Sequence, residues 1–178
     1  WSFKKIQSPN PPQIKDDSWS KNPIDKFIFS RLKENGLVPN EFAPQRTLIR
    51  RAYLNLIGIP PTPSQVNDFL NDKNPEAFTK VIDELLKSEH YGERWARHWL
   101  DVARYSDGHG GFGDNKALPQ AWRFRDWVVN ALNSDMPYDL FVKKQIAGDL
   151  LEDKDPIPTG FFVVGPTYNS DGGDPEAK

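Results

Sequence analysis

Cysteine is absent from this chain of 178 residues, and histidine occurs only three times, as His90, His98 and His109. The absence of thiols excludes disulfides, thiolate metal sites, a cysteine nucleophile and covalent haem attachment within these residues. The histidines show neither His-x-x-x-His nor His-Glu-x-x-His spacing, so the zinc-hydrolase pattern is missing too. There is also no Gly-x-Ser-x-Gly elbow of a serine hydrolase. A lack of cysteine does not by itself determine the redox compartment.

Long runs of one kind of residue are also missing. Lysine and arginine (23 residues) interleave with aspartate and glutamate (25 residues), and the formal net charge is -2. No basic run indicates a nucleic-acid partner, and no apolar run approaches the roughly 20 residues that span a bilayer. The chain starts Trp1-Ser2-Phe3, which we interpret as a processed or excised segment. We therefore do not take the lack of a signal peptide as an argument for the cytoplasm.

What the chain does have is aromatic residues, 12% of the total, and prolines placed mainly at helix starts and in loops. Its length suits one domain with an extended arm. We predict a mainly α, multi-helix globular domain with an extended Pro-rich N-terminal arm and few or no strands. The arm is expected at residues 1–21, where Pro9, Pro11 and Pro12 oppose regular structure.

Apolar periodicity and capping residues give the expected helices. Trp1, Phe3, Ile6 and Trp19 are expected to pin the arm to the helical domain, residues 22–178. Helices are predicted over 22–36, 47–58, 62–70, 74–86, 88–105, 122–133 and 137–150, with a short strand or extended segment at 161–164. The polar stretch that ends at Lys178 is an unusual end for a domain, so we expect these residues to be the N-terminal part of a longer domain.

The helix expected at 88–105 carries the first candidate site. Arg94, Arg97, Asp101 and Arg104 fall on one side of it, and the spacing of Arg97, Asp101 and Arg104 lets one carboxylate meet two guanidinium groups. The simpler interpretation is a solvated ion-pair ladder of small energetic value. The functional alternative is a face that binds carboxylates or other oxyanions.

A glycine-rich loop follows at residues 106–118, with four glycines among Asp107, His109 and Asp114. It matches neither a phosphate-binding loop nor the calcium spacing of an EF-hand. Its aspartates suit a hard cation, and His109 is the candidate ligand for a transition metal or haem iron. A flexible surface loop is the alternative. Arg123 and Asp126 of the next helix complete the candidate ligand-binding set. We expect residues 107–115 to lie beside the helix that carries Arg94, Arg97, Asp101 and Arg104.

Several sequence blocks together resemble one family. They are Asn22-Pro23-Ile24-Asp25-Lys26-Phe27-Ile28, residues 46–63 (RTLIRRAYLNLIGIPPTP), residues 90–105 (HYGERWARHWLDVARY), and Pro137-Tyr138-Asp139 with Ala147-Gly148-Asp149. They are similar to the domain of unknown function that follows a cytochrome c-like domain in large planctomycete-type surface proteins. The resemblance covers essentially the whole chain.

The resemblance implies an exported protein of the periplasm or cell surface. Proteins of this kind are often encoded near polysaccharide-degrading enzymes. It also implies a continuation that carries a Cys-x-x-Cys-His haem-attachment motif. The expected cofactor is therefore none within this chain, with a c-type haem in the continuing polypeptide. The expected partners are the remainder of the same polypeptide or a second chain derived from it, a cytochrome c domain, and polysaccharide. No catalytic residues carry over from the family.

Three functional hypotheses remain open from the sequence. The first is a non-catalytic or redox-supporting module that helps to house a c-type haem carried by a following segment. The second is an extracellular carbohydrate-directed enzyme or binding module, with Asp107, His109 and Asp126 as its polar cluster. The third is a structural module of a surface complex, which predicts a large apolar interface and no small-molecule pocket.

Overall fold

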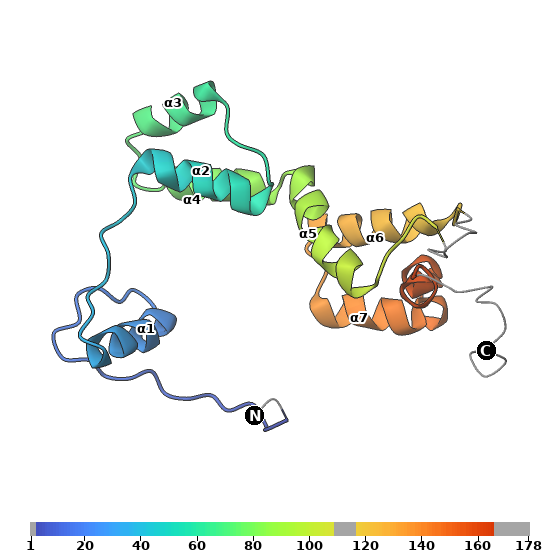
Figure 1. Cartoon of the computed structure of the whole chain (residues 1–178), viewed down its shortest axis with the longest axis horizontal. Helices are drawn as coiled ribbons and strands as arrows, with labels where there is room; N and C mark the ends of the chain where they lie inside the picture. Colours follow the sequence, from blue (N-terminus) through green and yellow to red (C-terminus); the bar gives the residue numbers. More distant parts are fainter. Residues whose placement is uncertain (1–2, 109–116, 166–178) are drawn as a thin grey trace, which may run out of the picture. The chain divides into compact units, whose positions relative to one another are not determined.

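The structure is a computed structural model that describes residues 3–108 and 117–165 (Figure 1). The chain divides into two compact units, residues 1–43 and 44–178, each treated by itself below. The described residues are mainly helical and include no strand, only an isolated antiparallel bridge between Gly108 and Ala117. The predicted fold class is confirmed. None of the described helices has the length and apolar character needed to cross a membrane.

The first unit holds the proline-rich segment and one helix, α1 (Pro23–Glu34). The predicted helix start is confirmed, because the Asn22 side chain accepts a hydrogen bond from the Asp25 amide. The predicted end is confirmed as well: Gly36 has a φ of +67°, and the Leu37 amide donates to the Leu32 carbonyl. This is the Schellman arrangement, which favours glycine.

Packing within the first unit is sparse. Trp19 contacts Phe29 with ring centroids 5.7 Å apart, as expected for a residue that anchors the arm. The anchoring role expected of Phe3 and Ile6 is wrong, because both side chains are almost fully exposed. Trp1 lies outside the described residues. None of the described side chains of this unit is buried, since about 40 residues cannot enclose a core.

The second unit begins with three helices, α2 (Gln45–Leu56), α3 (Pro63–Asn71) and α4 (Ala77–Leu86). They bury one apolar cluster: Ile49, Ala52, Tyr53, Phe69, Ala77 and Leu85. The capping box predicted from Thr62 and Gln65 is present, with both reciprocal bonds formed. The start predicted at Asn74 is wrong. The Asn74 side chain accepts from the Glu76 amide in a turn, so α4 begins three residues later.

The same unit continues with α5 (Glu89–Val102), α6 (Ala121–Asn133), α7 (Tyr138–Ala147) and two 3-10 helices, η1 (Gly148–Leu150) and η2 (Ile157–Phe162). They enclose a second cluster: Ala96, Ala103, Ala121, Phe124, Val128, Ala131, Phe141 and Val164. The alternative predicted for residues 161–164, a strand or extended segment, is wrong. Pro156 and Pro158 favour a tight helical turn there, and Val164 donates to the Gly160 carbonyl.

Trp99 joins α5 to α7 and η2 inside this second cluster. Its ring meets Phe141 edge-on at 5.0 Å between centroids and lies 6.0 Å from Phe161. The indole nitrogen donates to Gln145 Oε1 at 2.7 Å, and Gln145 is 3% exposed. Gln145 Nε2 in turn donates to the Phe141 carbonyl. The buried amide of Gln145 thus pairs with the partly buried indole, which fixes the orientation of the ring.

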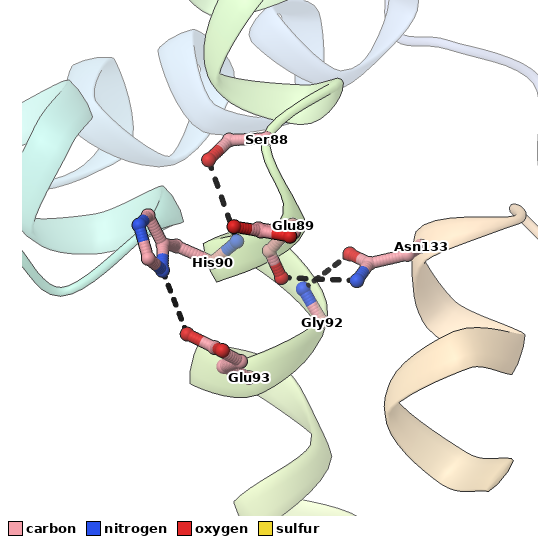
Figure 2. A network of polar contacts seen from close by, with 6 residues as sticks. All are labelled: Ser88, Glu89, His90, Gly92, Glu93 and Asn133. Atoms are coloured by element: carbon pink, nitrogen blue, oxygen red, sulfur yellow. Dashed lines mark hydrogen bonds and ion pairs between the residues drawn. The ribbon is translucent and has the colours of Figure 1, made fainter. Parts of the chain in front are cut away.

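The start of α5 lies beside the end of α6, where the Asn133 side chain forms hydrogen bonds between the two helices (Figure 2). Asn133 Oδ1 accepts from the Gly92 amide at 2.7 Å, and Asn133 Nδ2 donates to the Glu89 carbonyl at 2.9 Å. One amide side chain therefore satisfies an amide group in the first turn of α5 that has no partner within its own helix. A Cβ atom at position 92 would lie only 2.5 Å from the Val129 carbonyl oxygen.

We expect Gly92→Ala to destabilise the second unit. Alanine is the better helix former, but its methyl group would collide with the backbone of α6 and break the hydrogen bonds of Asn133. The free energy of unfolding should therefore fall by about 1–3 kcal/mol. Urea denaturation followed by circular dichroism measures the change in the free energy of unfolding. Asn130→Ala, an exposed change on α6, serves as the control. A Gly92→Ala protein as stable as wild type would contradict the packing described for α5 and α6.

Candidate functional site

An apolar cavity of about 360 Å³ lies where the first turn of α6 meets η2. Leu118, Ala121 and Phe124 form one side, and Ile157 and Val164 belong to the other. Gln120, Arg123 and Thr159 are its polar or charged lining residues. A volume of a few hundred cubic ångströms, walls that are mostly apolar and a few polar groups are typical of small-molecule sites.

The walls of this cavity are held by hydrogen bonds on both sides. Ala121 donates to the Leu118 carbonyl at the start of α6, and the Ser106 amide donates to the Val164 carbonyl at 3.0 Å. Gly160 permits the close contact, because a Cβ atom there would lie 3.2 Å from Phe124 Cβ. The cavity is therefore built by residues far apart in the sequence, and it requires both η2 and α6.

A polar groove of about 530 Å³ runs along the other side of α6, between α5 and α6. Ala96, Leu100 and Val129 supply its apolar lining. Its polar lining residues are Glu89, Glu93, Arg97, Arg125, Asp126, Asn130 and Asn133. Two of the predicted site residues, Arg97 and Asp126, are thus brought to one groove from different helices.

Tyr105, Asp107, Arg125 and Asp126 form a charged cluster near this groove. The Tyr105 hydroxyl donates to Asp107 Oδ1 at 2.7 Å, and Arg125 pairs with Asp126 at 2.9 Å. Burial raises the pKa of Tyr105 to about 12, and the hydrogen bond to Asp107 adds to that rise. The hydrogen bond to Asp126 raises the pKa of Arg125. The sequence singled out Asp107 and Asp126 but missed their partners, Tyr105 and Arg125.

The predicted ladder of Arg97, Asp101 and Arg104 does not form. Among the described residues, Asp101 makes no ion pair within 4.0 Å with either arginine. For Arg104 the reason is that α5 ends at Val102, so this residue lies beyond the helix with a φ of +54°. Tyr105 donates to the Leu100 carbonyl there, in a Schellman motif in which arginine replaces the usual glycine.

The remaining candidate residues lie apart from one another. Arg94 packs at Gly58, near the end of α2, with its Nε atom buried and without a hydrogen-bond partner. Arg123 lines the apolar cavity and lies 5.6 Å from the Trp122 ring centroid. The seven predicted site residues that the structure describes are therefore distributed over several places in the second unit. His109 and Asp114 lie outside the described residues.

The base of the glycine-rich loop, residues 106–108 with Ala117 and Leu118, is described. Leu118 donates to the Asp107 carbonyl at 2.7 Å, and Gly108 donates to Ser106 Oγ. Because α5 leads directly into this base, Asp107 lies close to the end of the helix, as the sequence predicted. This base connects Asp107 of the charged cluster to Leu118 of the apolar cavity.

Two described histidines have ordinary surroundings on α5. His90 Nδ1 lies 2.7 Å from Glu93 Oε2, and this hydrogen bond raises the pKa of His90 (Figure 2). His98 lies against Trp95 with ring centroids 5.5 Å apart. Within the described part of the chain, no three His, Cys, Asp or Glu side chains are placed to hold a metal ion.

One family model matches the chain, over residues 23–178, and its description is PSCyt2, protein of unknown function (DUF1549). The match spans both compact units and starts at the first residue of α1. No curated protein and no solved structure matches the chain.

We expect Asp107→Asn to lower the pKa of Tyr105 towards its ordinary value near 10, because the neutral amide no longer opposes a negative phenolate. Ultraviolet absorbance of the phenolate during an alkaline titration measures this shift as a difference between the two proteins. In wild type, the raised pKa contributes stability below pH 10 that is lost as the pH rises towards 12. Identical titration curves would show that Asp107 does not act on Tyr105.

Proposed function

The chain belongs to the PSCyt2 family, and from this premise we propose that it is a non-catalytic, redox-supporting module of an exported, cytochrome c-associated protein. Its role is to provide an apolar wall for a c-type haem carried by another segment or chain, and a positive charge for the carboxylates of that haem. The apolar cavity between α6 and η2 is the observation that carries this proposal. The family name, with its reference to a cytochrome, supports the same direction.

The cavity residues suit the edge of a haem better than its iron. Apolar side chains such as Phe124 and Ile157 fit the face of a porphyrin, and Arg123 fits its carboxylates through the planar guanidinium fork. No histidine, methionine or cysteine is among the described lining residues, so the axial ligands would come from elsewhere. When bound, the haem supplies one-electron transfer. This chain's residues exclude water from the porphyrin edge and bind its carboxylates.

The proposal is tested first on the natural full-length protein. Its visible absorption spectrum should show a c-type haem, and a protein without haem would remove the proposal. We then expect Arg123→Leu to lower the midpoint potential by on the order of tens of millivolts, because losing a nearby positive charge favours oxidised iron. Potentiometric titration measures the change. Arg50→Leu, an exposed arginine of α2 that does not line the cavity, should leave the potential unchanged.

A second candidate function, a carbohydrate-directed enzyme or binding module, is favoured by the groove between α5 and α6. Carboxylate, guanidinium and amide groups line that groove together with apolar residues, and such groups can form hydrogen bonds with the neighbouring hydroxyls of a sugar. Asp107 lies in the charged cluster near the groove. A polysaccharide screen with Asp107→Ala and Asp126→Ala variants discriminates this function from the first. Activity that both variants retain in full would exclude these aspartates from the chemistry.

The third hypothesis, a purely structural module, predicts no small-molecule cavity. The cavity of about 360 Å³ between α6 and η2 counts against it. We therefore favour a ligand-binding role over an exclusively architectural one.

A further inference from the structure

A third hollow, of about 290 Å³, is lined by residues of α2, α3 and α4, the first three helices of the second unit. Figure 1 shows these three helices side by side. Its apolar side is formed by Ile49 of α2, Phe69 of α3 and Val81 of α4, all from the first apolar cluster. Its polar side carries charged side chains from α3, α4 and the turn between them. Neither the sequence motifs nor the proposed haem-supporting role uses this hollow.

Tyr53 is the most informative residue of this hollow. Its side chain lines the hollow and is only 8% exposed. Its hydroxyl has no hydrogen-bond partner among the described residues, yet it is not sealed from solvent like the buried unpaired Arg94 Nε. Here the hydroxyl oxygen is a free acceptor at the wall of an accessible hollow.

The charges around Tyr53 are mainly negative. Asp68, Asp72 and Glu84 line the hollow with one cation, Lys80, so its formal charge is -2. Lys80 is held only loosely, with Nζ 3.7 Å from Asp72 Oδ2. Burial raises the pKa of Tyr53, and the negative charge of Glu84 adds to this, so that carboxylate acts on the phenol. The hollow therefore combines an apolar wall, aromatic rings, and oxygen atoms that can accept hydrogen bonds from a cation.

We propose that the hollow between α2, α3 and α4 binds a primary ammonium group carried on an aliphatic chain. The carboxylates of Asp68 and Glu84 would accept from the ammonium, together with the Tyr53 hydroxyl. The aliphatic chain would lie on Phe69 and Val81, and the aromatic faces add a cation–π attraction. A bare metal ion is not favoured, because the described residues include no group of three His, Cys, Asp or Glu side chains placed to ligate one.

This chemistry has two sources, a small free amine or a lysine side chain of a partner protein. The probes are n-pentylamine for the first and Nα-acetyl-lysine amide for the second. Nα-acetyl-norleucine amide has a similar aliphatic stem without the ammonium and is the matched control. Each is titrated into the whole chain and followed by NMR chemical shifts of Ile49, Phe69 and Val81.

We expect at least one amine to bind with shifts at these residues, and norleucine amide to bind at least about tenfold more weakly. Binding of pentylamine alone assigns the site to a free amine, and binding of the lysine derivative assigns it to a protein partner. Equal binding of the lysine and norleucine derivatives, or no binding by either amine, overturns the proposal.

Single substitutions distinguish a site that recognises the ammonium charge from one that binds only the aliphatic chain. Glu84→Gln and Asp68→Asn should each weaken amine binding about threefold, the scale of one exposed ion pair. Asp83→Asn removes an exposed carboxylate of α4 that does not line the hollow, and it should change nothing. Lys80→Met should strengthen binding about twofold or more, because it removes the competing internal ammonium. Unchanged affinity in Glu84→Gln and Lys80→Met together would refute the assignment.

Discussion

The close approach of α5 to α6 is the constraint on which most of the second unit depends. It is possible because α5 places the small residues Gly92 and Ala96 against α6, and because Asn133 bonds backbone groups of α5. With the helices this close, Phe124 and Val128 are fully enclosed. A larger residue at position 92 would push the helices apart, and the groove and the core behind it would change together.

The two hollows on either side of α6 differ in chemistry because α6 has different neighbours there. Towards η2, apolar residues and a proline-rich turn leave an apolar space, with Arg123 among its lining residues. Towards α5, charged residues of both helices line a groove together with Ala96, Leu100 and Val129. The base of the glycine-rich loop joins the two, since Asp107 accepts from Tyr105 through its side chain and from Leu118 through its carbonyl. A change in the loop base is therefore expected to affect both hollows.

The helical part made by α2, α3 and α4 rests on a separate apolar cluster. Tyr53 belongs to this cluster through its ring, while its hydroxyl keeps access to solvent. This double character explains why a buried residue also contributes to a charged surface hollow. Nothing in the spacing of Asp68, Asp72 and Glu84 along the sequence indicates that they share one hollow with Tyr53, since they come from different elements.

The ends of most helices follow from local sequence patterns. Asn22, Thr62, Gly36 and Gly58 act through bonds and backbone angles within a few residues, so local pattern suffices to predict them. Only the tertiary structure decided which charged side chains meet. Arg97 lines one groove with Asp126 of another helix, Arg94 lies at Gly58, Tyr105 bonds Asp107, and Arg125 pairs with Asp126. Such contacts depend on helix packing and on the exact end of α5, and neither is encoded in residue spacing along a single helix.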